Sequence, residues 1–569
     1  MERFKAIYGY NDIMGLSIPD DPFGLLRKYS TKHILIKLAH INAIIYSMGE
    51  NKYDDRILKE IFFDQFPIKQ KIPSVEWCLR KGGSLFASPH LSELIKEALN
   101  NYSEDLNIDF KFHEFSFDLF FTILIYNDIY NQRPVPESTL TSFKDLFSLQ
   151  AIQQYYIRST NPITYLIKFG FICKFLSEDN QLRELTIRFC KDYGIASPWN
   201  ISKFLINLYQ ATDKQIAKFG LEKSAIPNEF LKDWTLNHEY IKQKSKITLN
   251  FDIIPRPLFD VDEDSLIILD FNFFQYTVDQ GFFYKIFSKT IAPLNIKLSR
   301  INEFKAYIGK NFFEEFLCKT ILTKLFPSRQ QIVYSDDEFQ DFLVKTSSNN
   351  LLVIESKMTE VHAKTMEDMN FEYFKKQIED NFLKKKGADK RNKGAYQILH
   401  QLKQISKNEN EEKIKKILKI KNVKNLNIYP ILITSDVNYN ISGVNSYIND
   451  ACFEDFELVK KEFQSIKPIL VLNINTLLNY FGYFKRKNTN LTNLITSYFK
   501  TIGKHKNQYK TSKNIYSYLM ASKSFESFVQ EKLKDESLIE NFDPFAENFK
   551  AELSDINFFG EHSLESTIN

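Results

Sequence analysis

Apolar residues recur every three or four positions from residue 1 to about residue 240, which is the spacing of amphipathic helices. The segments that carry this pattern are Leu25–Ser47, Pro89–Asn100, Leu140–Arg158, Thr164–Leu176, Leu182–Tyr193 and Ile201–Tyr209. Ser88 and Pro89 add a cap and a first-turn proline at one helix start. We therefore expect residues 1–245 to form a helical module that serves target recognition, contact with a protein partner or regulation.

The pattern changes near Ile247. Leu258–Val261 and Leu266–Phe271 are short strand-like runs, and the turn-forming cluster Asp262-Glu263-Asp264-Ser265 separates them. The sequence thus predicts a small β-containing connector over residues 246–300.

Helical and strand patterns alternate from Phe304 onward. A polar turn, Thr346-Ser347-Ser348-Asn349-Asn350, lies between two strand patterns and favours a hairpin. The predicted elements are a helix at Asn311–Phe326, strands at Phe339–Lys345 and Leu351–Lys357, a helix at Gly394–Ser406, and strands at Ile428–Thr434 and Pro468–Asn473. We expect an α/β domain over residues 301–485.

Residues 486–569 are first basic and then acidic, with helix-like segments but no clear core. A chain of 569 residues is too long for one core, so two to four domains are expected. The predicted fold class is therefore multidomain: mostly α, with a small β element and an α/β C-terminal part.

Two charged residues end the apolar run Leu351-Leu352-Val353-Ile354. Strand side chains alternate between faces, so Glu355 and Lys357 point one way and Ser356 points the other. A buried strand rarely ends in two charges on one face unless something binds them.

Asp341 starts the partner strand, and the short turn brings it toward Glu355. Two carboxylates held together repel each other, and a divalent cation removes that repulsion. Because all the ligands are oxygen atoms, Mg²⁺ or Mn²⁺ is expected rather than zinc. Such an ion polarises a phosphate and lowers the pKa of a bound water, while Lys357 orients that water or stabilises the charge developing on the phosphate.

A third carboxylate is expected from the helix at Asn311–Phe326. Glu314 lies in line with the apolar positions that follow it at helical spacing, whereas Glu315 is followed by Lys319 and Thr323 and should point outward. Glu314 is thus the preferred metal ligand, and Glu315 is the alternative.

This arrangement resembles the PD-(D/E)XK nuclease superfamily, which includes many restriction endonucleases and phage-defence nucleases. The family's acidic residue before a hairpin is matched by Asp341, its E-x-K by Glu355-Ser356-Lys357, and its helix glutamate by Glu314 after Ile308-Gly309. The resemblance covers Phe304 to about Phe481, and the proline that often precedes the family's aspartate is missing here.

In a subset of the family a glutamine on the following helix joins the site. Gln397, in Lys393-Gly394-Ala395-Tyr396-Gln397, is similar to it, and Gln401 is the second choice. The resemblance implies a restriction-endonuclease-like αβββαβ core and a Mg²⁺-dependent nuclease that acts on DNA rather than RNA, in defence against phage or foreign DNA.

Two less specific interpretations stay open. A plain hairpin can carry a solvated Glu–Lys pair at its end without any catalytic role. A nuclease fold can also persist as a non-catalytic adaptor or regulatory protein, because a fold does not imply an activity.

A basic segment precedes the helix of Gln397. If it lies near the site, it is suited to neutralising phosphates without reading sequence, although a solvated loop is the simpler interpretation of a charge run. Its residues are Lys384, Lys385, Lys386, Lys390, Arg391 and Lys393.

Composition excludes several other classes. The net charge is only +4, and the five cysteines show no CxxC spacing, which argues against a zinc site or a disulfide framework and fits the cytoplasm. There is no phosphate-binding G-x-x-x-x-G-K-[ST] loop and no signal-peptide core, and the most apolar run, Leu119–Tyr126, is too short to cross a bilayer. We expect a cytoplasmic protein without a membrane partner, in which oligomers remain possible.

Overall fold

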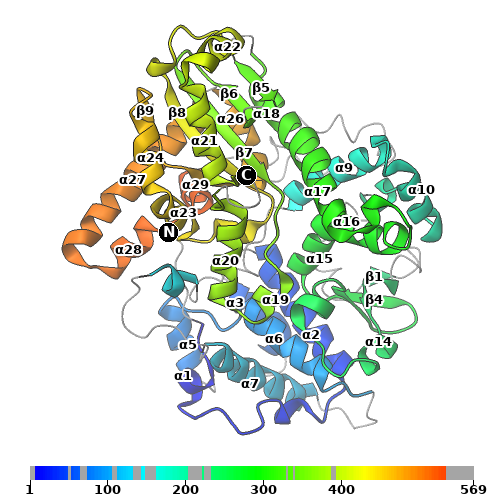
Figure 1. The fold of residues 1–569 in the computed structure, drawn as a ribbon. Helices are drawn as coiled ribbons and strands as arrows, with labels where there is room; N and C mark the ends of the chain where they lie inside the picture. The colour runs from blue at the N-terminus through cyan, green and yellow to red at the C-terminus, as the bar shows by residue number, and fades with distance from the viewer. Residues whose placement is uncertain are drawn as a thin grey trace, which may run out of the picture. The chain divides into compact units, whose positions relative to one another are not determined.

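The computed structural model describes residues 7–48, 53–63, 73–104, 112–131, 142–147, 162–202, 221–222, 232–328, 331–336, 340–385, 392–487 and 489–533. The chain is mostly α-helical with two mixed sheets (Figure 1). Its described residues divide into two compact units: unit 1 holds residues 142–147 and 295–533, and unit 2 holds residues 7–131 and 162–294. The chain thus passes between the units more than once.

Unit 2 is built on helices whose apolar faces form one buried cluster around Leu38, Leu94 and Phe120. Among these helices α2, α6 and α7 pack side by side (Figure 1). The helical elements are α1 (Tyr10–Met14), η1 (Gly24–Leu26), α2 (Thr31–Met48), α3 (Tyr53–Ile57), η2 (Leu58–Phe63), α5 (Pro73–Arg80), α6 (Ser88–Asn100), α7 (Phe112–Asn131), α9 (Pro162–Glu178), α10 (Arg183–Asp192), α14 (His238–Lys242), η4 (Leu249–Ile253), α15 (Phe271–Val278), α16 (Gln280–Ile286) and η5 (Phe287–Ile291).

Most of the helices expected from the sequence are present with shifted ends. The helix expected from Leu25 begins at Thr31, because Gly24–Leu26 forms a separate 3₁₀ turn. Of two other expected helices, Leu140–Arg158 and Ile201–Tyr209, only residues 142–147 and 201–202 are among those described.

The small β element is confirmed as part of a four-stranded sheet in unit 2. Its strands are β1 (Leu221–Glu222), β2 (Thr235–Leu236), β3 (Leu258–Asp260) and β4 (Ser265–Ile268), in the order β1-β4-β3-β2. β3 and β4 correspond to the two predicted strand runs on either side of Asp262–Ser265 and pair antiparallel, and β2 runs parallel to β3. The second run is shorter than expected: β4 ends at Ile268, and Phe271 begins α15 with Asp270 as its N-cap.

Unit 1 contains a mixed sheet in the order β10-β8-β7-β6-β5, with β9 paired to β8. β5, β6 and β7 form an antiparallel meander, whereas β8 runs parallel to β7 and β10 parallel to β8. The strands are β5 (Ile332–Asp336), β6 (Gln340–Lys345), β7 (Asn350–Lys357), β8 (Asn427–Thr434), β9 (Ser465–Ile466) and β10 (Leu470–Asn473).

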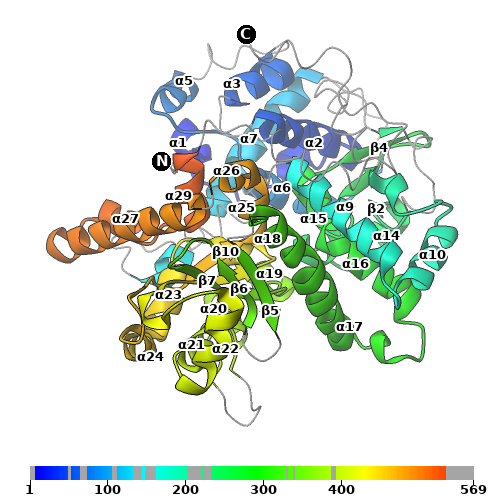
Figure 2. The same cartoon turned by 90° about the horizontal axis from the view of Figure 1, so that it is seen from above.

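Helices flank this sheet, and two of them pack against β7: η7 and α21 (Figure 2). The unit's helical elements are η6 (Lys297–Ser299), α17 (Ile301–Tyr307), η7 (Ile308–Cys318), α18 (Lys319–Leu325), α19 (Ala363–Glu367), α20 (Phe371–Phe382), α21 (Ala395–Ile405), α22 (Asn408–Leu418), η8 (Val423–Asn425), η9 (Val437–Asn440), α23 (Val444–Ala451), α24 (Phe453–Lys460), α25 (Ile474–Asn479), α26 (Phe481–Arg486), α27 (Asn490–Ser512), α28 (Ile515–Ala521) and α29 (Phe525–Lys532).

The strands predicted at 339–345, 351–357, 428–434 and 468–473 correspond to β6, β7, β8 and β10. The helix expected to start at Asn311 begins ten residues earlier in an unbroken run from Ile301 to Leu325, because Phe304 and Ile308 continue its buried face. β5 was not among the strands predicted from the sequence; it pairs only with β6, at the end of the sheet path.

Residues 142–147 pack into unit 1 through two phenylalanines. Phe143 stacks on Tyr447 of α23 with ring centroids 5.2 Å apart, and Phe147 stacks on Phe374 of α20 at 4.8 Å. A stretch from the first third of the sequence thus completes the aromatic core of the unit that contains the predicted site. Within the described part of the chain, none of the helices has the length and apolar character needed to cross a membrane.

Candidate active site

The end of β7 presents Glu355 and Lys357 between two neighbouring strands. β7 pairs with β6 on one side and with β8 on the other, so its apolar residues are covered and Glu355 is 0% exposed. The Lys357 side chain keeps 26% of its surface exposed, and its Nζ forms an ion pair with Glu355 Oε1. A buried acid therefore lies against a partly exposed base, as expected from strand alternation.

Asp341 reaches the same strand end from β6. It lies one residue beyond the last cross-strand pair, Phe342–Ile354, and therefore opposite Glu355. Its Oδ2 accepts hydrogen bonds from the Ser356 backbone N–H at 2.6 Å and from the Ser356 hydroxyl at 2.8 Å. Ser356 was expected to point away from the acidic pair, but the pairing ends at Phe342 and leaves the Asp341 carboxylate able to reach it.

Glu314 comes to this group from η7, which is wound in π-helical turns rather than the expected α-helical ones. Backbone hydrogen bonds in such turns join residues five apart, so Gly309 and Glu314 lie about one turn apart on the same side of the helix. A Cβ on Gly309 would lie 3.7 Å from Met358 Cβ, which places this face beside the end of β7. Glu315 instead pairs with Lys319 at 3.0 Å, one turn along the outer side of the helix.

Burial and neighbouring carboxylates raise the pKa of all three acidic groups. Burial raises the pKa of Glu355 to about 8, with Asp341 and Glu314 adding to the shift and Lys357 opposing it. Burial and the charges of Asp341 and Glu315 raise the pKa of Glu314 to about 7. Burial also raises the pKa of Asp341, with the charge of Glu315 adding to the shift and Lys357 and the two Ser356 hydrogen bonds acting against it.

Lys357 is the positive member of this group. Burial by itself lowers its pKa, but the negative charges of Glu355 and Asp341 outweigh burial and raise it. Glu314, Asp341, Glu355 and Lys357 therefore form one electrostatically coupled cluster, which unites the carboxylates and the lysine that the sequence singled out.

Comparison of the chain with models of protein families, with curated proteins and with solved structures finds no match. The candidate site therefore rests on its own geometry.

The donor set of this cluster suits a hard divalent cation, because its three acidic groups offer only oxygen and repel one another. Among the described residues, no group of three or more His, Cys, Asp or Glu side chains is gathered so that it could hold a metal ion as it stands. Instead, the Lys357 ammonium is the cation in contact with Glu355. A metal that uses Glu355 would have to separate this ion pair.

The predicted glutamines lie on α21, which packs against β7. Gln397 is half-buried, and no hydrogen bond joins it to Asp341, Glu355 or Lys357 within the described structure. Gln401 buries its Oε1 without a hydrogen-bond partner among the described residues. Gly394, ahead of α21, has φ 55°, and a Cβ there would lie 2.5 Å from Phe382 Cα, so the glycine of this motif serves helix packing.

The basic segment is described only in part, because Lys386, Lys390 and Arg391 lie outside the described residues. Lys385 pairs with Asp455 of α24 at 2.8 Å and lies 4.7 Å from the centre of the Tyr396 ring. The backbone N–H of Lys393, an exposed residue, donates to the Lys384 carbonyl at 2.9 Å. Lys385 is thus held by the protein itself, while Lys393 faces solvent.

Three residues that sequence reasoning did not assign to the site belong near it. Ser356 fixes Asp341, and Lys310 on η7 lies close enough to Glu314 to lower its pKa, although burial outweighs that effect. Thr434 of β8 pairs in register with Lys357, is 0% exposed and has no hydrogen-bond partner for its hydroxyl among the described residues. The E-x-K pattern itself points to Ser356, whereas Thr434 emerges only once the β7–β8 register is known.

Proposed function

We propose that the chain is a metal-dependent nuclease that hydrolyses phosphodiester bonds, of DNA rather than RNA, with Mg²⁺ or Mn²⁺. The observation that carries this proposal is the coupled cluster of Glu314, Asp341, Glu355 and Lys357 at the end of a buried strand. Three carboxylates with raised pKa values beside one lysine are costly to stability, and such clusters are typical of functional sites.

The fold around the cluster supports a restriction-endonuclease-like core. A helix containing η7 precedes the antiparallel strands β5, β6 and β7, helices follow, and β8 then lies parallel to β7. This order corresponds to αβββαβ with Glu355 on the third strand. The expectation of a role in defence against foreign DNA rests on the resemblance alone.

In this proposal Glu314, Asp341 and Glu355 hold the cation, and Ser356 keeps the Asp341 carboxylate in place through its backbone N–H and hydroxyl. The cation would polarise the scissile phosphate and lower the pKa of the attacking water. Lys357, released from Glu355, would present its ammonium to the phosphate and stabilise the negative charge that develops there. The Lys357 side chain is suited to that contact because part of it is already exposed to solvent, where a substrate can reach it.

The decisive experiment incubates the purified full chain with supercoiled plasmid and with single-stranded DNA and RNA, in Mg²⁺ or Mn²⁺ and in EDTA. Cleavage should require the cation, and Glu355→Gln and Asp341→Asn should each lower its rate at least about 100-fold with the melting temperature retained. Glu303→Gln is the control, since Glu303 is a partly exposed carboxylate on the helical run that carries Glu314.

Wild-type rates in either carboxylate variant would refute the site. A folded wild-type protein that cleaves none of these substrates with either metal would instead support the non-catalytic adaptor.

A further inference from the structure

Unit 2 contains a second group of charged side chains, at the beginnings of β2 and β3. These strands run parallel, and the Leu258 N–H donates to the Trp234 carbonyl at 3.1 Å. The residues just ahead of the strands, Asp233 and Arg256, therefore come from the same end of the sheet. Lys285 of α16 reaches this end and donates a hydrogen bond from Nζ to the Asp233 carbonyl.

The carboxylate of Asp233 already has two other partners. Lys289 of η5 pairs with Asp233 Oδ2 at 2.8 Å, and the Tyr193 hydroxyl donates to the same oxygen. Lys285 consequently meets the backbone carbonyl rather than the carboxylate. Within the described part of the chain it has no ion pair.

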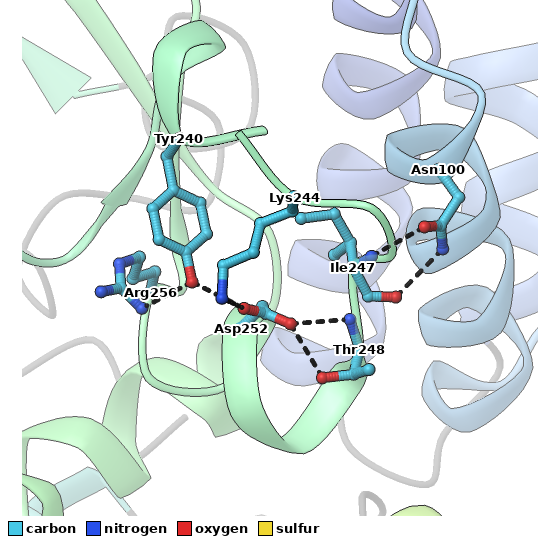
Figure 3. A network of polar contacts seen from close by, with 7 residues as sticks. All are labelled: Asn100, Tyr240, Lys244, Ile247, Thr248, Asp252 and Arg256. Atoms are coloured by element: carbon cyan, nitrogen blue, oxygen red, sulfur yellow. Dashed lines mark hydrogen bonds and ion pairs between the residues drawn. The ribbon is translucent and has the colours of Figure 1, made fainter. Parts of the chain in front are cut away.

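Arg256 likewise forms no ion pair within the described part of the chain (Figure 3). Its guanidinium lies 4.2 Å from the centre of the Tyr240 ring and donates to the Tyr240 hydroxyl at 3.2 Å. The nearby buried carboxylate, Asp252, is paired with Lys244 at 3.1 Å and accepts from the Tyr240 hydroxyl at 2.6 Å. Thr248 supplies Asp252 with two further hydrogen bonds, at 2.9 and 2.8 Å.

The charges at this place do not cancel. Lys289 balances Asp233 and Lys244 balances Asp252, which leaves Arg256 and Lys285 as two half-buried cations without carboxylate partners among the described residues. Burial, together with the positive charge of Arg256, lowers the pKa of Lys285 to about 7, while the charge of Asp233 acts in the opposite direction. An anion bound between the two cations would remove this repulsion, just as a metal ion would at the carboxylate cluster.

We propose that Arg256 and Lys285 bind a phosphate group in its dianionic form. A bound anion favours the protonated form of Lys285, and the two positive charges then match a terminal phosphate, which carries about −1.5 to −2 at pH 7, better than a phosphodiester or a carboxylate. The planar guanidinium offers paired donors to phosphate oxygens, and stacking on Tyr240 holds it in place before the ligand arrives. The ligand is either free phosphate or the terminal phosphate of a nucleotide chain.

Isothermal titration calorimetry of the full chain with inorganic phosphate, in a phosphate-free buffer with EDTA, tests the site. The wild type should bind one equivalent, and Arg256→Gln and Lys285→Met should each weaken binding about tenfold or more, because each removes a charge-assisted hydrogen bond. Lys246→Gln is the matched control, since Lys246 is an exposed lysine of the same unit. If Lys285→Met does not fold, Arg256→Gln tests the site alone, because Arg256 lies outside the helices and strands and its replacement should leave the fold intact.

Octathymidylates with a 5′-phosphate and with a 5′-hydroxyl identify the source of the phosphate. A preference for the phosphorylated end that both variants lose assigns the site to nucleic-acid termini, whereas binding of inorganic phosphate alone assigns it to free phosphate. A wild type that binds neither, or variants that bind as the wild type does, would overturn the proposal. Because EDTA blocks cleavage and Glu355 lies in the other unit, this result is independent of the proposed nuclease activity.

Discussion

The raised pKa values of Glu314 and Glu355 predict how tightly the cluster binds Mg²⁺ at each pH. A carboxylate must lose its proton to become a ligand, so protons compete with the metal below the pKa of each group. Two glutamates with the ordinary pKa of 4.5 would be ionised throughout the neutral range, and metal affinity would then be nearly independent of pH. The values of about 7 for Glu314 and about 8 for Glu355 predict the opposite.

The size of the effect follows from the protonated fraction of each group. With these two pKa values the apparent affinity for Mg²⁺ should rise about 50-fold between pH 6 and pH 7 and about 20-fold more between pH 7 and pH 9. At pH 7 about 1.4 protons should leave per ion bound, about 0.9 from Glu355 and about 0.5 from Glu314. Asp341, whose pKa is also raised, acts in the same direction.

Calorimetric Mg²⁺ titrations at pH 7, in two buffers with different ionisation enthalpies, count the released protons directly. Titrations at pH 6, 7, 8 and 9 give the affinity profile, with circular dichroism to verify that the chain stays folded. Glu314→Gln should lower the proton count by at least about 0.5, because it removes one titrating group and also a charge that raises the pKa of Glu355. Glu315→Gln should lower the count less, because Glu315 only adds to the raised pKa values of Glu314 and Asp341 and is itself paired with Lys319. A flat affinity profile and no proton release in the folded wild type would refute both the ligand assignment and the electrostatic argument behind it.

Three substitutions test single contacts in unit 1. Thr434→Val keeps the shape of the side chain and removes a buried hydroxyl that has no hydrogen-bond partner among the described residues, so thermal melting should show equal or higher stability. A severalfold fall in single-turnover cleavage would show that the hydroxyl positions Lys357, whereas unchanged cleavage would exclude Thr434 from the site. Gln397→Ala should lower the cleavage rate about tenfold without affecting stability, as the family resemblance implies. Equal rates in the variant and the wild type would exclude Gln397 from the site. Phe147→Ala removes a ring that stacks on Phe374 and should cost unit 1 about 3–5 kcal/mol in urea unfolding; a loss below about 1 kcal/mol would show that residues 142–147 do not contribute to its core.

Sequence patterns predicted those parts of the fold that depend on local chemistry. The apolar runs at Leu351–Ile354 and Ile428–Thr434 gave β7 and β8 because both strands are buried on both faces. The pattern of β5 is weaker, because Ile332–Asp336 is short and partly polar and residues 332–335 are only half-buried. The tail from residue 490 showed no clear core, yet α27 buries Leu491, Ile495 and Tyr498 against neighbours that only the fold supplies.

Some residues of the candidate site can likewise be predicted from the sequence, whereas others depend on the fold. Asp341, Glu355 and Lys357 could be grouped from the sequence, because a hairpin with a short turn leaves few choices of register. The hydrogen bonds of Ser356 to Asp341 and the pairing of Thr434 with Lys357 depend on where the strand pairing ends and on a parallel neighbour more than 70 residues away. The predicted division into four domains stays a prediction; residues 246–294 of the connector fall in unit 2, whereas residues 295–300 and the described residues of the tail fall in unit 1.

The placement of Phe143 and Phe147 in unit 1 has a consequence for the order in which a ribosome delivers the chain. Phe143 leaves the ribosome about 230 residues before Phe371, its aromatic partner on α20, which at roughly 5–20 residues per second is a delay of roughly 10–50 s. β10, which completes the sheet beside β8, follows later still. The carboxylates and Lys357 can therefore take up their final arrangement only when most of the polypeptide has been made, so nascent chains that stop early would lack the assembled site.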